Sequence, residues 1–309
     1  MDLTCINTID CKQGAVRAVR FNVDGAYCLT CGSDKKLKLW NPYRSLLLKT
    51  YGGHANEVLD AAGSCDSGQI LSCSSDKSII LWDVSTGQPL RRLRTHASAV
   101  CCVKFNEEST LAISGSHDNT VAIWDLKSRK NEPIQILNEA KDCINAIQVT
   151  DYEIITGSVD CSVRRYDIRA GQMFADFVGA PITSVSLTHD GQCILISAAD
   201  NSVKLFDKTT GEMLAEYIGH RTDDMNVESA VITNDNYVFS GSITGELWCW
   251  DLISAKVVKR YDHTLHKVLH SVAVHPRKDI LLTASVNTIK VWGKPEDIVV
   301  YSNVQYEDT

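Results

Sequence analysis

An aromatic residue that ends an alternating, strand-like segment recurs along the entire chain. Its seven positions are Trp40, Trp82, Trp124, Tyr166, Phe206, Trp250 and Trp292. They are separated by 42, 42, 42, 40, 44 and 42 residues. A four-stranded unit that copies itself at a period of roughly 40–45 residues is typical of a β-propeller blade. The repeat therefore predicts a ring of seven blades.

The repeats leave too few residues for a second domain. Seven units of this period account for nearly all of the 309 residues, so we predict one all-β domain over residues 1–309. In the third unit, strands are expected at 100–105, 111–115 and 120–124, because turn-forming residues separate these apolar segments. A four-stranded sheet of this size cannot bury both faces alone, so it must stack against its copies in a ring.

The ring also needs a closing strand. Residues 3–9 precede the first inner strand and have no earlier blade to join. We expect them to supply the outer strand of blade seven, because closure removes exposed sheet edges. Residues 298–301 are the competing candidate for that role. Residues 293–309 are expected to form a C-terminal tail, in part an extended strand.

Two repeats carry the same four polar and aromatic residues at the same spacing: His54, Ser72, Asp76 and Trp82, then His96, Ser114, Asp118 and Trp124. With these residues the chain resembles the WD-repeat family over essentially its whole length. The resemblance implies one hydrogen-bonded network in each blade. Such a network satisfies a buried indole N–H through a hydroxyl, an imidazole and a carboxylate.

The remaining blades depart from this pattern. Blade one has Thr30, Asp34 and Trp40 but no histidine, and blade four has Thr156 and Asp160 with Tyr166. Blade six has His220, Ser240 and Trp250, with Thr244 in the place of the aspartate. Blade five keeps Asp200, and blade seven keeps Trp292 alone. We therefore expect blades five and seven to be the least stable.

Composition and motifs argue against several classes of function. The net charge of −7 and pI near 5.7 disfavour direct binding of nucleic acid. Three groups of arginines lie in separate blades, so we expect solvated or salt-bridged side chains instead of a basic stripe. The groups are Arg17 and Arg20; Arg91, Arg92 and Arg94; and Arg164 and Arg165. The longest apolar segments have the length of strands, so no membrane span is predicted.

Catalysis and metal binding also lack a motif. The twelve cysteines are scattered, and the pair Cys28 and Cys31 lacks the second ligand pair that zinc requires. The four histidines His263, His266, His270 and His275 are expected in a solvated loop. We therefore predict no cofactor, no metal and no enzymatic activity. Abundant thiols without a disulfide framework favour a reducing, intracellular compartment.

Loops on a rigid ring are the usual place for partner contacts. Aligning the repeats on blade three places two residues per blade at the rim of the narrower face. The candidates are Arg17, Glu57, His117, Val159, Pro181, Asn226, Ile243 and Val268. The four apolar members are expected either to form a binding crescent or to line the channel.

The segments at 14–25, 28–35 and 57–63 narrow the resemblance to WD-repeat scaffolds of mitogen-activated protein kinase modules. It implies a non-enzymatic, monomeric scaffold, cytoplasmic and nuclear, that assembles components of the Raf–MEK–ERK cascade. Spliceosomal and cell-polarity proteins are further implied partners. An alternative is a substrate receptor of a cullin-RING ubiquitin ligase, because Asp167 and Arg169 belong to an aromatic-Asp-x-basic box that resembles those of such receptors.

Overall fold

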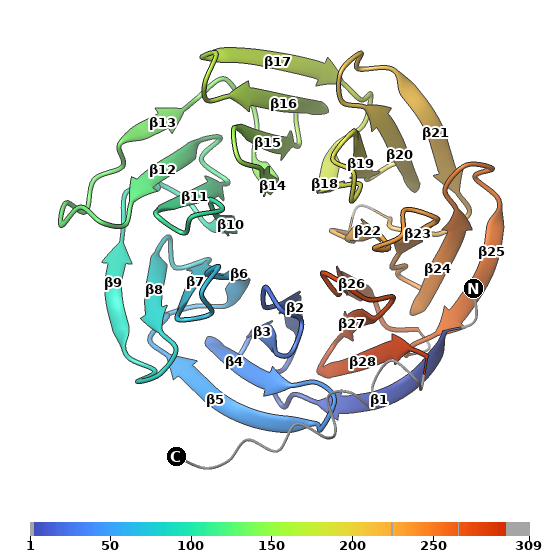
Figure 1. Ribbon diagram of the computed structural model, residues 1–309, viewed down its shortest axis with the longest axis horizontal. Coiled ribbons are helices and arrows are strands. Elements are labelled where there is room, and N and C mark those ends of the chain that lie inside the picture. Colours follow the sequence, from blue (N-terminus) through green and yellow to red (C-terminus); the bar gives the residue numbers. More distant parts are fainter. Residues whose placement is uncertain (1–2, 224, 265, 295–309) are drawn as a thin grey trace.

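The computed structural model describes residues 3–223, 225–264 and 266–294. Within these ranges the chain forms seven four-stranded antiparallel sheets and no helix. Figure 1 shows the sheets arranged as blades of a ring, each with one strand near the centre and one at the circumference. The predicted all-β, seven-bladed propeller is confirmed.

In blades one to six the strands run from the centre outward in chain order. The inner strands are β2 (Val16–Phe21), β6 (Val58–Gly63), β10 (Val100–Phe105), β14 (Ile144–Val149), β18 (Ile182–Leu187), β22 (Ser229–Val231) and β26 (Leu269–Val274). The second strands are β3 (Cys28–Gly32), β7 (Gln69–Ser74), β11 (Leu111–Ser116), β15 (Glu153–Ser158), β19 (Cys193–Ala198), β23 (Tyr237–Ser240) and β27 (Leu281–Ser285). The third strands, which carry the repeated aromatic residues, are β4 (Lys36–Asn41), β8 (Ile79–Asp83), β12 (Val121–Asp125), β16 (Ser162–Asp167), β20 (Ser202–Asp207), β24 (Glu246–Asp251) and β28 (Thr288–Gly293). The outer strands of blades one to six are β5 (Leu46–Gly52), β9 (Pro89–Leu93), β13 (Gln135–Leu137), β17 (Gln172–Phe177), β21 (Met213–Ile218) and β25 (Val257–Asp262).

The N-terminal strand closes the ring. β1 (Thr4–Asp10) pairs antiparallel with β28 and completes the sheet of blade seven in the order β1-β28-β27-β26. Blade seven therefore combines both ends of the described chain, which confirms the predicted closure (Figure 1). The competing candidate at residues 298–301 lies outside the described residues.

The core lies between blades. Seven clusters of buried apolar side chains are found in the described chain, one at each interface between neighbouring blades. Trp82, for example, packs against Leu29, Leu37 and Tyr51 of the preceding blade. All seven repeated aromatics are buried. The 42-residue period therefore places one large anchor at each interface.

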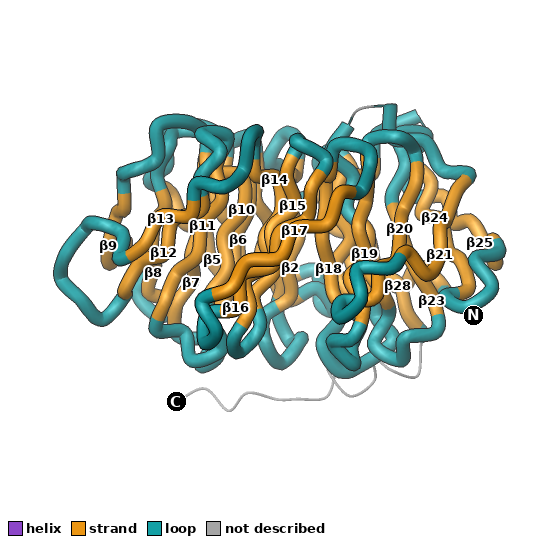
Figure 2. The backbone as a smooth tube through the Cα atoms, turned by 90° about the horizontal axis from the view of Figure 1, so that it is seen from above, coloured by secondary structure: helices purple, strands orange, loops and turns teal. Residues whose placement is uncertain are grey.

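Loops emerge at the two ends of the ring (Figure 2). We call the end that carries the outer-to-inner loops and the hairpins between second and third strands the network face. The other end, with the hairpins after the inner and third strands, is the hairpin face. A β-bulge occurs near the start of six inner strands; β22 of blade six has none. Bulges re-aim the chain, and β22 pairs with β23 without one.

Candidate protein-interaction face

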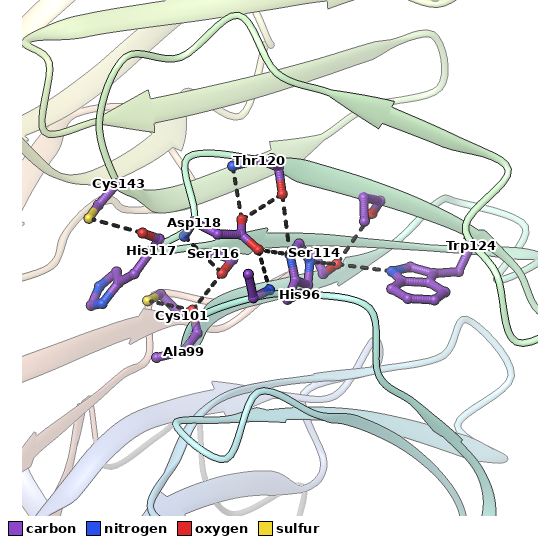
Figure 3. A network of polar contacts seen from close by, with 12 residues as sticks. His96, Ala99, Cys101, Ser114, Ser116, His117, Asp118, Thr120, Trp124 and Cys143 are labelled. Atoms are coloured by element: carbon purple, nitrogen blue, oxygen red, sulfur yellow. Dashed lines mark hydrogen bonds and ion pairs between the residues drawn. The ribbon is translucent and has the colours of Figure 1, made fainter.

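The hydrogen-bond network of blade three ties the network face to the core (Figure 3). The indole N–H of Trp124 donates to Oγ of Ser114 at 3.0 Å, and that hydroxyl lies 2.9 Å from Nε2 of His96. Nδ1 of His96 lies 3.0 Å from Oδ2 of Asp118, which also accepts the backbone N–H of Ala97. Because a carboxylate only accepts, the imidazole carries its proton on Nδ1.

A threonine completes this network. The hydroxyl and the backbone N–H of Thr120 donate to Oδ1 of Asp118 at 2.5 and 3.1 Å. Burial alone would raise the pKa of Asp118, but the hydrogen bond from Thr120 and the nearby His96 lower it. The carboxylate is therefore held ionised and joins two loops of the network face. Sequence reasoning missed Thr120, although a hydroxyl two residues after the aspartate recurs in blades two and five.

Blade two repeats the arrangement. Trp82 donates to Ser72 at 2.8 Å, His54 lies 2.7 Å from Ser72, and His54 lies 3.2 Å from Asp76. Burial lowers the pKa of His54, so its imidazole is neutral near pH 7. The four residues expected to form each network are thus brought together in both blades.

Blade one builds the same connection without histidine. Thr30 accepts the indole N–H of Trp40 at 3.0 Å and donates to Oε1 of Gln13 at 2.5 Å. Nε2 of Gln13 donates to Asp34 at 3.3 Å and to the carbonyl of Lys36. An amide supplies both a donor and an acceptor, so it replaces the imidazole. The sequence comparison of blades missed this glutamine because it considered only histidine.

Blades four and five replace the histidine with a cation on the third strand. Arg164 contacts Asp160 at 2.6 Å and Lys204 contacts Asp200 at 2.9 Å, both four residues after the aspartate. Both cations are largely buried, with 7% and 10% of the side chain exposed. An ion pair therefore holds the hairpin that a hydrogen bond between the aspartate and a histidine holds in blades two and three.

Blades six and seven depart from the sequence prediction. His220 is buried, but neither ring nitrogen has a hydrogen-bond partner among the described residues. Trp250 instead donates to the carbonyl of Ile218 at 3.1 Å. In blade seven, Trp292 is not alone: it donates to Thr283 at 2.7 Å, and the neighbouring His263 is buried. The prediction of a solvated histidine loop is therefore wrong for His263.

His275 corrects the same prediction. It is 1% exposed, and its Nδ1 accepts the backbone N–H groups of Arg277 and Lys278 at 2.9 and 3.0 Å. Burial lowers the pKa of His220, His263 and His275 to about 4. These imidazoles are therefore neutral structural groups.

Four of the eight rim candidates lie together around the centre of the ring. A cavity of about 930 Å³ runs through the inner strands and is lined by Arg17, Glu57, His117 and Asn226, among others. Arg17 and Glu57 form an ion pair at 2.9 Å with more than a third of each side chain exposed. His117 and Asn226 are exposed. The mouth of the cavity on the network face is therefore polar and accessible.

The four apolar candidates lie outside this cavity lining. Pro181 is exposed, whereas Val159, Ile243 and Val268 are half-buried. Val159 donates its N–H to the carbonyl of Cys143, as expected for this rim position, but Ile243 donates to Arg221 in the preceding loop. In blade six the N–H of Ile243 thus meets the carbonyl of Arg221 and not that of Asn226, and the place of both residues at the rim stays a prediction.

A charged cluster crosses the cavity between blades that are not neighbours. Arg20 of β2 contacts Asp60 of β6 at 2.9 Å and Glu228, next to β22, at 2.5 Å. Burial opposes ionisation of Arg20, but the two carboxylates hold its pKa well above the usual value. The hydroxyl of Ser271 donates to the same Glu228 carboxylate. Blades one, two, six and seven are thus linked through one guanidinium.

The two residues considered for ligase docking lie in one turn of the hairpin face. The carboxylate of Asp167 accepts the N–H groups of Arg169 and Ala170 at 2.8 and 2.9 Å. The guanidinium of Arg169 lies 3.9 Å from the ring centre of Tyr152. Both side chains therefore have local roles in the turn, and their role in docking stays a prediction.

The structure offers few groups for chemistry. Burial raises the pKa of the Cys28 and Cys31 thiols in β3, which keeps them protonated. Among residues 3–294, apart from the two undescribed positions, no three or more metal-ligating side chains are grouped. The same part of the chain contains no helix long and apolar enough to span a membrane.

The fold and the repeated network together define a WD40-repeat propeller. A family model for the WD domain, G-beta repeat, matches residues 3–41. A second model, described as the N-terminal domain of nucleolar protein 10-like proteins, matches residues 60–239. The class expected from the repeats is confirmed.

Three relatives narrow the family. The chain is 61% identical to WD repeat domain-containing protein 83 of Xenopus tropicalis over 92% of this chain and 90% of the relative. It is 56% identical to the protein of that name from Rattus norvegicus and 52% identical to that from Homo sapiens, each over 93% of this chain and 91% of the relative. The chain belongs to the WD repeat domain-containing protein 83 family.

Proposed function

We propose that this protein is a non-enzymatic, monomeric scaffold that assembles mitogen-activated protein kinase modules of the Raf–MEK–ERK type. Spliceosomal and cell-polarity proteins are its further proposed partners, which places it in the cytoplasm and the nucleus. The observation that carries the proposal is identity above 50% over nine-tenths of the vertebrate relatives, on a fold whose loops are held by internal networks. Rigid loops of this kind suit protein recognition.

The rim of the central cavity on the network face is the proposed contact surface. Arg17, His117 and Asn226 are accessible there and lie on three different blades. Partner side chains can enter the cavity mouth without displacing a packed core. Polar and charged rims of this kind favour orientation and specificity over raw affinity.

Affinity purification with crosslinking tests the proposal. The tagged full chain should recover kinase-cascade or splicing proteins, with crosslinks near the rim. The variant R17A/H117A/N226A should recover less of them, while T50A/E216A on the exposed outer strands β5 and β21 should recover as much as the unmodified chain. If neither group of proteins is recovered, the proposed function is wrong. Recovery of a cullin-RING adaptor that is lost in R169E would favour the ligase alternative.

A further inference from the structure

A long turn of blade three projects from the ring at the hairpin face. Figure 1 shows it between β12 and β13, and it spans residues 126–134. Three cations on it, Lys127, Arg129 and Lys130, are exposed. Across the described chain none of the three takes part in an ion pair, although eight pairs between Lys or Arg and a carboxylate are formed elsewhere. These cations are therefore available to a partner.

Arg91 of the neighbouring outer strand β9 holds this turn in place. Its guanidinium donates to the carbonyl groups of Asp125, Leu126 and Ser128 at 3.0, 3.2 and 2.7 Å. It donates further to the carbonyl of Lys130 at 2.5 Å. The guanidinium therefore binds the inner side of the turn through hydrogen bonds to backbone carbonyl groups. No carboxylate of the described chain neutralises it there.

The turn is also capped from within. Oδ1 of Asp125 accepts the N–H groups of Lys127 and Ser128 at 2.8 and 3.1 Å, and Oγ of Ser128 accepts the N–H of Lys130. These hydrogen bonds fix the backbone of the turn, so the three exposed cationic side chains are attached to a backbone of defined conformation. Less conformational freedom remains to be lost on binding than in a flexible loop.

The charge of this turn is opposite to that of the whole chain. Four cations, including Arg91, stand against the two carboxylates Asp125 and Glu132, and Asp125 is already committed to the turn. The protein as a whole carries −7. A long polyanion would meet that repulsion beyond the turn, whereas a short acidic peptide would not. The described part of the turn also has no aromatic side chain on which a base could stack.

We propose that the turn at 126–134, which we call the blade-three turn, binds an acidic segment of a protein partner. Carboxylates of the segment pair with Lys127, Arg129 and Lys130 while Arg91 maintains the shape of the turn. This surface lies on the face opposite the rim. The proposal for the blade-three turn is therefore independent of the partners proposed above for the rim.

Fluorescence anisotropy with a labelled dodecapeptide of alternating Asp and Glu tests the proposal on the full chain. At an ionic strength of about 0.15 M, K127E/R129E/K130E should weaken binding at least about tenfold, since three exposed ion pairs become repulsive. The matched control K141E/K256E/K267E reverses three exposed lysines elsewhere and changes the net charge equally. It should bind within about twofold of the unmodified chain, because distant exposed charges are largely screened.

A second variant tests the shape of the turn. R91Q keeps the three exposed cations but removes the guanidinium that holds their backbone, and it should weaken binding about threefold or more. Equal weakening by both triple variants would attribute binding to net charge and overturn the proposal. Stronger competition by an RNA dodecamer or by inorganic phosphate than by unlabelled peptide would also overturn it. Circular dichroism of each variant verifies that the propeller is folded.

Discussion

Replacing Ser114 with alanine removes the hydroxyl at the junction of the blade-three network. That oxygen accepts the N–H of Trp124 at 3.0 Å and lies 2.9 Å from the imidazole of His96. Without it, a buried indole donor and a buried ring nitrogen both lose their partner. One unsatisfied buried group costs about 1–3 kcal/mol. We expect Ser114→Ala to lower the free energy of unfolding by about 2–4 kcal/mol, because the neighbouring groups relax in part.

Ser240 supplies a control at the equivalent place in blade six. It is equally buried, but its hydroxyl donates only to the carbonyl of Gly241 at 3.3 Å among the described residues. Trp250 has a different acceptor, the carbonyl of Ile218. Ser240→Ala therefore strands no buried donor and should cost about 1 kcal/mol or less. Ser114→Thr is the conservative variant, because Thr30 holds the same junction in blade one.

Urea unfolding followed by tryptophan fluorescence and by circular dichroism measures these differences. The midpoint should shift strongly for Ser114→Ala, slightly for Ser240→Ala and little for Ser114→Thr, with unchanged slopes. Equal shifts for the two alanine variants would refute the reasoning. The loss would then come from burying a methyl group in place of a hydroxyl, and the network would carry no special weight.

Three further variants test other parts of the structure. Arg20→Met should cost about 3 kcal/mol in thermal unfolding, because the buried Asp60 and the partly buried Glu228 lose their counterion, whereas Arg17→Met should cost under about 1 kcal/mol. Gln13→Leu should cost about 1–3 kcal/mol by the same measurement, through the stranded hydroxyl of Thr30. His220→Phe should be neutral or stabilising at pH 7, because an unpaired buried imidazole is removed. Since the pKa of His220 is about 4 when folded, the unfolded chain binds a proton first as pH falls from about 6.5 to 4. Stability is lost over that window, and urea titrations there should show a smaller loss for His220→Phe; an identical loss would exclude His220 as a source.

The ring could be predicted from the chain because its anchors are periodic. One aromatic per repeat fills each blade interface, so the spacing alone gives the number of blades. Closure by β1 also follows from counting, since a strand before the first inner strand has only blade seven to join. The full networks of blades two and three were predictable because four residue types recur at fixed spacing there.

The rest depends on contacts that no local pattern contains. Gln13 replaces a histidine because an amide, like a neutral imidazole, offers one hydrogen-bond donor group and one acceptor. A comparison of the blades that looks only for histidine misses it. The pair Arg20 and Glu228 is separated by 208 residues, and closure of the ring brings it together. Each failure is one in which tertiary geometry decides which partner a polar group meets.

The two faces of the ring are stabilised by different means. On the network face, a carboxylate binds a side chain that belongs to the same blade, as Asp118 binds His96 in blade three. On the hairpin face, an outer strand holds the turn of the next blade, as Lys49 does with the carbonyl of Val84 and Arg91 with the blade-three turn. A substitution in a network therefore acts within one blade, whereas loss of Arg91 acts on its neighbour. Because the cavity and the blade-three turn share none of these supports, a partner at one surface leaves the other available, which is the geometry that a scaffold for two proteins requires.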